Sequence, residues 1–417
     1  MCRVGMTEGT SWKKKLKTKE YASVFLIIFN SFSWYFPLYI FFVNAVESLQ
    51  LEYNIVLFIF SIHYIAVVAF AVIGDLLSSK IGSKKLLSSW IFIGVIVSAL
   101  MYLLSIGGIE WIYFISFSLG VSLGLGFPSC LTFFADHTAV EYRGSFGGVT
   151  YFLTCTGMFL IGFVGSTLDF TANVLVFTLW RMIGLVFFLY LGPKESRRTE
   201  AKEVNYKAIL QERAFILYLV PWTMFCLVNF FEIPFFDFPL QQYFLGTNLR
   251  YLVSIAEFGI GGISALVGGL LSDAIGRKRI IISAYVMVGI GYAVLSFSSV
   301  NPIVFYLYLV LDGVSWGIFA LMFYLIVWGE LALSRPKNKY YLVGILPFLV
   351  ANFMTFVVEP YIGAIPTFAS FSLASFFLFL AVVPLMYAPE TLPEKQIKDR
   401  ELKDYIEKAK RAKEKHP

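Results

Sequence analysis

The sequence predicts an all-α membrane protein with twelve transmembrane helices arranged in two related halves. Three observations predict it: an apolar composition, positive charges confined to alternate loops, and an internal repeat. Hydrophobic residues make up 58% of the 417 residues, and charged residues make up only 14%. A typical soluble domain carries about 25% charged residues. The composition therefore predicts membrane spans and not the several soluble domains that the length alone would allow.

Positive charge is concentrated in the two tails and in every second loop. Of the 33 lysines and arginines, 31 lie before residue 21, in 78–86, 135–144, 193–214, 277–279 or 334–340, or after residue 389. The intervening loops hold only Arg250, and Arg181 lies inside an apolar run. This positive-inside pattern predicts that both termini are cytoplasmic. It also explains the net charge of +6 without a nucleic-acid partner, which we do not expect.

The apolar runs have the length of membrane spans. A transmembrane helix needs about 20 apolar residues to cross about 30 Å of hydrocarbon. The first half has six expected spans, at 21–46, 55–77, 87–106, 111–134, 145–167 and 173–192. The second half has six more, at 215–240, 251–271, 279–297, 302–327, 341–363 and 367–387. The run after the lysine-rich N-terminus is longer than a signal-peptide core, so we expect the first span to be retained.

The longest internal polar stretch, 193–214, divides the chain near its middle. Its mixed charges suggest a surface helix, and the charges of 394–417 suggest a solvated helix. The alternative for both is a plain solvated segment near anionic lipid. The predicted organisation is an N-terminal bundle with its tail over 1–192, a cytoplasmic loop over 193–214, a C-terminal bundle over 215–388 and a cytoplasmic tail over 389–417.

The chain repeats itself at an offset of 194 residues. Residues 73–89, IGDLLSSKIGSKKLLSS, align without a gap with residues 267–283, VGGLLSDAIGRKRIIIS, and eight of 17 positions are identical. The same offset places Asp136 on Glu330 and Arg143 on Lys337, two helices later. Two matches at equivalent points of a six-helix unit indicate a duplication. Duplicated bundles around a central site are a transporter architecture.

The second copy of the repeat resembles the G-x-L-x-D-x-x-G-R-K loop of the major facilitator superfamily. All defined positions match, at Gly269, Leu271, Asp273, Gly276, Arg277 and Lys278. The first copy departs from the pattern, because Ser79 stands where the carboxylate is expected and Asp75 where the glycine is expected. Asp75 lies four residues before Ser79 on the same helical face, so it could do a similar job one turn higher.

Two shorter motifs support the resemblance. Asp136 with Arg143-Gly144 resembles the D/E-(x6)-R-G signature after helix 4, and Pro389-Glu390-Thr391 resembles the PET that follows helix 12 in sugar and organic-ion porters. The resemblance implies the superfamily fold of two pseudo-symmetric six-helix bundles. It also implies a secondary transporter that moves a small solute by alternating access. The helix 7 signature of sugar porters and the full helix 5 motif of drug antiporters are absent, which disfavours both substrate classes.

The repeated loops are predicted to act as a conformational lock. A loop carboxylate can lie against the positive end of a facing helix or pair with the basic residues that follow it. The alternative is a loop that serves only the topology. The residues predicted to form the lock are Gly269, Asp273, Gly276, Arg277, Lys278, Asp75, Gly82, Lys84, Asp136, Arg143, Glu330 and Lys337.

Polar groups inside the spans are candidates for substrate binding or proton coupling, because such groups are costly in hydrocarbon. They are Asp312, Glu257, Glu232, Asn229, His63, Arg181 and Asn30. The repeat relates His63 to Glu257, and each lies near mid-membrane, roughly 16 Å from its loop at about 1.5 Å per residue.

The resemblance divides these candidates among the helices. It places Asn229, Glu232 and Asp312 on helices that line the central cavity, and His63 and Glu257 on helices at the seam between the halves. Helix 6 is peripheral in the superfamily, so Arg181 could instead be a structural charge within its own half.

Several functions remain open at this point. The first is proton-coupled symport of a polar metabolite or organic ion, in which protonation of Glu257 and Asp312 removes charges that are costly in an occluded state. The others are an uncoupled facilitator and a receptor of the same fold that binds solute without moving it. We expect a lipid bilayer, a small solute and protons as partners, the plasma membrane as location and a monomeric functional unit.

An enzyme is not expected. The chain contains only three histidines, at 63, 137 and 416, and it lacks H-E-x-x-H, G-x-S-x-G and a phosphate-cradling loop. Cys130, Cys155 and Cys226 fall in apolar runs without metal-ligand spacing. We therefore expect no cofactor and no metal.

Overall fold

The computed structural model describes residues 5–193, 195, 204–237, 256–296, 302–332, 335–358, 360–361 and 367–392. Within these residues, twelve helical spans are long and apolar enough to cross a membrane. The prediction of an all-α membrane protein with twelve spans is confirmed. The helix expected at 394–417 and parts of the spans expected at 215–240, 251–271 and 341–363 lie outside the described residues.

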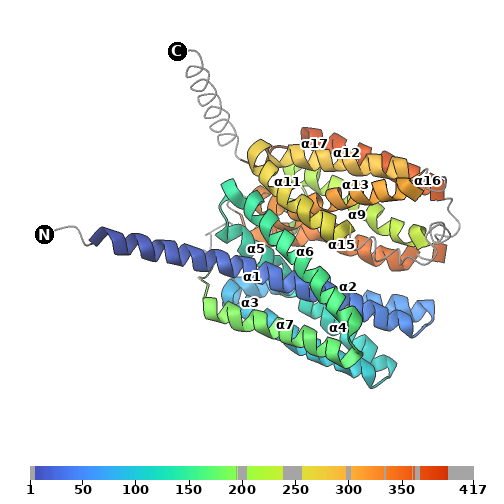
Figure 1. The fold of residues 1–417 in the computed structure, drawn as a ribbon, viewed down its shortest axis with the longest axis horizontal. Coiled ribbons are helices and arrows are strands. Elements are labelled where there is room, and N and C mark those ends of the chain that lie inside the picture. Colours follow the sequence, from blue (N-terminus) through green and yellow to red (C-terminus); the bar gives the residue numbers. More distant parts are fainter. Residues whose placement is uncertain are drawn as a thin grey trace, which may run out of the picture.

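The first half holds six spans. Its helices are α1 (Gly5–Ser48), α2 (Tyr53–Ile81), α3 (Ser83–Leu100), α4 (Ile109–Gly124), α5 (Phe127–His137), α6 (Arg143–Thr167) and α7 (Phe170–Leu191). The 3-10 turns η1 (Met101–Ser105) and η2 (Val140–Tyr142) follow α3 and α5. Helix α1 starts well before the predicted residue 21, and its first turns project from the bundle (Figure 1).

The fourth span is broken, although the sequence predicted one helix over 111–134. Helix α4 ends at Gly124, and α5 starts at Phe127 with Pro128 in its first turn. The indole of Trp90 fills the break and donates a hydrogen bond to the carbonyl oxygen of Ser122. A side chain at Gly126 would collide with that indole, so the break requires glycine.

The second half also holds six spans. Its elements are α9 (Arg213–Asp237), the π-turn η3 (Ala256–Ile260), α11 (Gly261–Ile275), α12 (Arg277–Leu295), α13 (Pro302–Ala320), the π-turn η4 (Leu321–Ile326), α14 (Val327–Leu331), α15 (Lys337–Val358), α16 (Thr367–Leu380) and α17 (Val382–Tyr387). Between the halves, a surface helix is expected within 193–214; residues 194 and 196–203 lie outside the described residues, and the described part forms one short helix, α8 (Tyr206–Ile209), capped by the side chain of Asn205.

The two halves form two bundles side by side (Figure 1). The two most extensive contacts between the bundles are those of α6 with α11 and of α2 with α15. We call these the α6–α11 seam and the α2–α15 seam. The 194-residue offset makes α2 equivalent to α11 and α6 equivalent to α15. The two seams are therefore copies of one contact.

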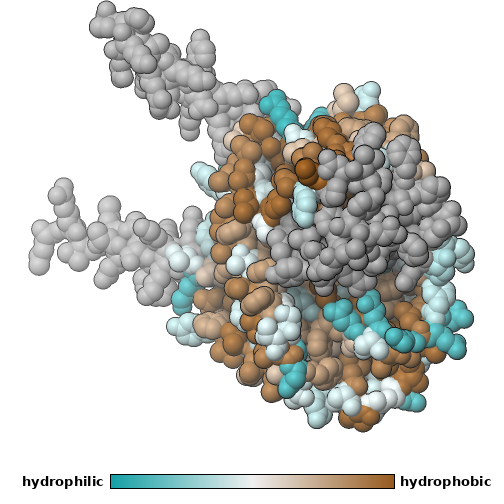
Figure 2. Space-filling model, turned by 45° about the vertical axis from the view of Figure 1, so that its right-hand side comes forward, coloured by the Kyte–Doolittle hydropathy of each residue, from teal (hydrophilic) through white to brown (hydrophobic). Residues whose placement is uncertain are grey.

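One end of the molecule carries both repeat loops and most of the contacts between charged groups. Gly82, Arg143, Gly276 and Lys337 lie there, and their neighbours bond across the halves. We call it the charged end. Elsewhere, apolar side chains cover wide areas of the described surface (Figure 2), and Leu175 on α7 is more than half exposed. Such an apolar surface suits hydrocarbon rather than water.

Candidate functional site

The α6–α11 seam brings two backbones into direct contact. A methyl group added to Gly144 would lie 2.5 Å from the carbonyl oxygen of Gly269, and one added to Gly148 would lie 2.7 Å from that of Ala265. Small residues permit this approach in membrane helices. Gly144, Gly148 and Gly269 therefore set the distance between the halves at this seam, and Gly269 is the one of the three that was predicted for the lock.

Asp273 binds the second half to the first turn of α6. Its carboxylate accepts hydrogen bonds from the backbone N–H of Gly144 at 3.0 Å and of Ser145 at 2.6 Å, and from the Ser145 hydroxyl at 2.5 Å. The free amides and the helix dipole favour a negative charge at this position. Arg277 donates to Asp273 at 2.5 Å and to the carbonyl oxygen of Val140 in the first half at 2.9 Å.

The repeat contains two equivalent acidic positions and two equivalent basic positions, and these form ion pairs between the halves. Arg143 lies 3.4 Å from Glu330, and Lys337 pairs with Asp136. Because Asp136 is equivalent to Glu330 and Arg143 to Lys337, each acid takes its base from the other half. The Arg143–Glu330 side chains are only 3% and 1% exposed, whereas those of Lys337 and Asp136 are 20% and 22% exposed. Glu330 also pairs with Arg277 at 3.4 Å.

Glu195 binds the start of α3 within the first half. Its carboxylate accepts the Ser83 hydroxyl at 2.7 Å and the backbone N–H of Lys84 at 3.3 Å. It therefore caps the start of α3, which follows Gly82 in a conformation with φ of 90°. A residue with a side chain would be strained at that φ. Of the residues predicted for the lock, Gly82 and Lys84 thus contact their own half.

Glu390 does the same in the second half. It accepts the backbone N–H groups of Arg277 at 2.8 Å and Lys278 at 3.1 Å, next to Gly276 with φ of 103°. Neither Glu195 nor Glu390 was predicted as a lock residue. The signal was present, because each glutamate follows a proline closely after the sixth span of its half, at nearly the repeat distance.

The first repeat loop lacks the bond that Asp273 makes. The hydroxyl of Ser79, the position equivalent to Asp273, donates to the carbonyl oxygen of Leu76 in its own helix at 2.7 Å. Asp75 is 9% exposed and accepts a hydrogen bond from the Tyr206 hydroxyl at 3.0 Å. Sequence reasoning proposed Asp75 as the substitute but did not identify Tyr206.

Aromatic rings from both halves meet at Tyr324 in η4. The ring centroids of Phe32, Trp222 and Phe348 lie 6.2, 5.9 and 5.4 Å from that of Tyr324. All four side chains are buried. Because Phe32 belongs to the first half and the others to the second, these rings form an apolar contact across the interface between the bundles.

The structure brings together the two carboxylates predicted for proton coupling. Glu257 in η3 and Asp312 in α13 are close enough to interact electrostatically. Glu257 also interacts with Tyr151 of the first half and with Tyr324, so it lies between the halves. Asp312 is 3% exposed, and its Oδ1 has no hydrogen-bond partner among the described residues. Among all the residues that the structure describes, no cluster of His, Cys, Asp and Glu could hold a metal ion.

Arg181 lies in the core of the first half. Its Nη1 donates to Asn30 Oδ1 and Ser31 Oγ, both at 2.9 Å. Its guanidinium carbon lies 4.3 Å from the ring centroid of Trp34 and 4.7 Å from that of Trp90. Guanidinium stacking between two indoles stabilises a buried cation. Arg181 and Asn30 are thus engaged with each other inside one bundle.

His63 is also satisfied within the first half. Its Nδ1 lies 3.2 Å from the carbonyl oxygen of Ser116, which can only accept, so Nδ1 carries the proton. Its Nε2 then accepts the hydroxyl of Tyr35 at 3.1 Å. Asn229 is buried on α9, and the side chain of Glu232 lies outside the described residues.

The comparisons with known proteins agree with this architecture. A family model described as Major Facilitator Superfamily matches residues 22–327. The fold is similar to that of the proton:xylose symporter XylE bound to 6-bromo-6-deoxy-D-glucose, with a TM-score of 0.69, 14% identity, and 92% of this chain and 97% of XylE covered.

Two further solved structures are similar. The human organic anion transporter MFSD10 (TETRAN) has a TM-score of 0.68 and 14% identity, with 88% of this chain and 99% of that protein covered. A bacterial homologue of the iron transporter ferroportin, in an outward-facing state, has a TM-score of 0.68 and 14% identity, with 89% and 98% covered. At such identities the likeness shows the fold alone. No curated protein matches the sequence.

Proposed function

The chain belongs to the major facilitator superfamily, and from that premise we propose that it is a proton-coupled secondary transporter that moves a small solute by alternating access. The observation that carries this proposal is the position of Glu257 and Asp312. Glu257 lies in η3, which contacts α6 of the first half, and it interacts with groups of both halves, while Asp312 lies beside it in α13.

The contacts at the charged end control whether that end of the protein is open or closed during alternating access. Asp273, Arg143 and Glu330 hold the halves together there through bonds that cross the interface. These bonds must break if that end is to open, so they bias a two-state equilibrium. Positive charge concentrates in the loops of this end, which supports its assignment to the cytoplasmic face. We propose the plasma membrane as location and a monomer as functional unit.

Proton coupling follows from the cost of charge in an apolar site. An ionised carboxylate is expensive to carry through an occluded state, and protonation removes that cost. Solute binding and protonation of Glu257 and Asp312 would then favour the same conformational change, which is the requirement for coupling. A facilitator, in which these groups only hydrogen-bond solute or a neighbouring helix, is the rival outcome.

The test is a proton-flux measurement in reconstituted vesicles that contain a pH-sensitive dye. D-xylose, an organic anion and tetraethylammonium are offered in turn, each with and without an imposed pH gradient. We expect one of the three classes to change the internal pH and to accumulate above equilibrium. Glu257→Gln and Asp312→Asn should abolish accumulation, and at least one should spare downhill exchange.

The matched control is Glu110→Gln, because Glu110 is an exposed acid at the start of α4. This variant should accumulate solute as the unmodified protein does. Solute uptake that neither moves protons nor responds to the gradient would replace symport by facilitated diffusion. Solute binding without any uptake would identify a receptor.

A further inference from the structure

The α2–α15 seam lacks the charged residues that bind the two helices at the α6–α11 seam. The repeat places Ser79 at the position of Asp273 and Ser83 at the position of Arg277. Ser79 is exposed, and its hydroxyl donates within its own helix. The pair of charged residues that binds the other seam is therefore replaced by two serines.

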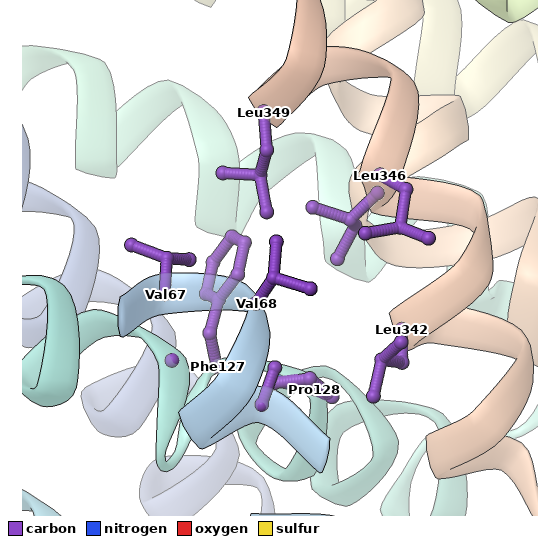
Figure 3. Close-up of a pocket in the computed structure, with 10 residues that line it drawn as sticks. Val67, Val68, Phe127, Pro128, Leu342, Leu346 and Leu349 are labelled. Atoms are coloured by element: carbon purple, nitrogen blue, oxygen red, sulfur yellow. The ribbon is translucent and has the colours of Figure 1, made fainter. Parts of the chain in front are cut away.

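The packing of this seam is also looser. Val67 and Val68 on α2 face Leu342, Leu346 and Leu349 on α15 around a small apolar cavity (Figure 3). The cavity measures about 10 Å³, at the lower limit for one water molecule, and its apolar lining disfavours water. Side chains, not backbone contacts, separate the helices here.

Asp75 lies against the helix start that the repeat would assign to it. Asn338 and Lys339, in the first turn of α15, are close enough to interact with its carboxylate. Under the 194-residue offset they are equivalent to Gly144 and Ser145, whose backbone N–H groups bind Asp273. Asp75 therefore faces the corresponding helix start, but through side chains instead of backbone amides.

Tyr206 from the central segment contacts both Asp75 and Lys339. Its hydroxyl donates to Asp75 Oδ2 at 3.0 Å, and Lys339 Nζ lies 5.3 Å from its ring centroid. Lys339 Nζ also donates to the carbonyl oxygen of Val204 at 2.9 Å. Burial and the neighbouring Asp75 raise the pKa of the Tyr206 phenol. The hydroxyl therefore keeps its proton and remains a donor.

The same segment is anchored to the second half at its other end. The Glu212 carboxylate accepts the Tyr340 hydroxyl at 2.7 and 2.8 Å and pairs with Arg335. Ile209, between the two attachment points, is fully buried. Residues 204–212 thus extend from anchors on the second half to Asp75 on the first.

We propose that residues 204–212 form a strap that closes the α2–α15 seam at the charged end, with Tyr206 as the residue that positions Asp75. This inference rests on the proposed alternating access, because it assigns the strap to one of the two gates of that cycle. The repeat supplies the lock at one seam, and the segment outside the repeat supplies it at the other. Opening at the α2–α15 seam then requires release of Tyr206.

The test measures opening directly, without a transported solute. Leu346→Cys places a thiol at the seam cavity, and its rate of reaction with a polar maleimide in detergent reports exposure above the background of the native cysteines. Tyr206→Phe removes only the hydroxyl. The loss of one hydrogen bond to a charged group should raise the reaction rate about 10- to 100-fold.

Three further variants sharpen this test. Asp75→Asn should raise the rate at least as much, because it also weakens the interactions with Asn338 and Lys339, and the double variant should exceed Asp75→Asn by little, because both changes break the Tyr206–Asp75 bond. Ser79→Asp in the Tyr206→Phe background should restore slow reaction, because it returns the carboxylate that the repeat pattern expects. Lys207→Ala is the matched control, since Lys207 is exposed on the same turn, and it should react as the unmodified protein does.

The outcomes separate the strap from the proposed function. An unchanged rate in Tyr206→Phe, or additive effects of Tyr206→Phe and Asp75→Asn, would overturn the strap. If Tyr206→Phe reacts faster but also lowers the thermal unfolding midpoint enough to account for the faster reaction, the strap would likewise be overturned. A general loss of stability would then explain the exposure of the cysteine. A chain that moves no solute but shows the expected rates would refute the transporter and leave the strap standing.

Discussion

At the α6–α11 seam there is no room for a methyl group between Gly144 and Gly269, whereas at the α2–α15 seam valine and leucine side chains surround a cavity. A carboxylate of the repeat loop binds backbone amides at the first seam, and a tyrosine from the central segment serves at the second. Two copies of one contact can therefore be closed by different parts of the chain. One closure is made by residues of the repeat itself, and the other is made by a segment that lies outside the repeat.

The largest expected effect concerns Glu330, the centre of the buried network beside the α6–α11 seam. Glu330→Gln leaves Arg143 and Arg277 without the carboxylate that both contact at 3.4 Å. Removing one partner of a buried ion pair costs about 3–5 kcal/mol. We expect a loss of that order in the free energy of unfolding, measured by chemical denaturation in detergent micelles.

Glu330→Asp provides the comparison for this variant, because it keeps the charge and should lose less stability. If Glu330→Gln unfolds within about 1 kcal/mol of the unmodified protein, as expected for an exposed pair, the network would not be buried in the sense described. The contrast between the two seams would then rest on glycine packing alone.

The next effect concerns the backbone contact itself. Gly269→Ala places a methyl group against the carbonyl oxygen of Gly144, and overpacking of this kind costs about 1–3 kcal/mol. We expect lower stability in the same denaturation experiment and faster maleimide labelling of a cysteine at Leu266 on α11.

Gly162→Ala on α6 is the matched control. An added methyl group there meets no atom within 4 Å, and alanine is favoured over glycine in a helix by up to about 1 kcal/mol. This variant should be as stable as the unmodified protein or slightly more so. Equal tolerance at both positions would contradict the close approach of α6 and α11.

The smallest effect concerns the partly exposed ion pair between Asp136 and Lys337. Asp136→Asn should cost no more than about 1 kcal/mol, because pairs of this exposure are screened by water and salt. The cost should fall further when denaturation is repeated at high ionic strength. A loss as large as that of Glu330→Gln would show that the two crossed pairs contribute equally, in spite of their different burial.

The sequence was informative where one physical rule sets the pattern. The thickness of hydrocarbon fixes the length of the apolar runs, so all twelve spans could be located, and the repeat identified Asp136, Arg143, Glu330 and Lys337 as related positions. The repeat could not show that each acid pairs with the base of the other half, because a sequence offset identifies equivalent positions and does not show which residues are in contact. That Arg143 meets Glu330 follows only from the way the halves face each other.

Other features depend on partners from distant segments. Arg181 was visible as a charge in an apolar run, but its stacking against Trp34 and Trp90 needs three helices to meet. Tyr206 lies outside the repeat, so no internal comparison pointed to it. The break at Gly126 was the exception, because the local run Gly124-Leu-Gly-Phe-Pro128 carried two glycines and a proline that could have predicted it.

Glu195 binds the start of α3, and Glu390 binds the start of α12, so the segment after the sixth span of each half is bound to the third helix of that same half. A homodimer of one such bundle would carry two identical seams, because a two-fold axis copies every residue of an isologous interface. Joining the bundles in a single polypeptide removes that obligation. In a single chain, Ser79 can therefore differ from Asp273, because a substitution in one copy is not repeated in the other.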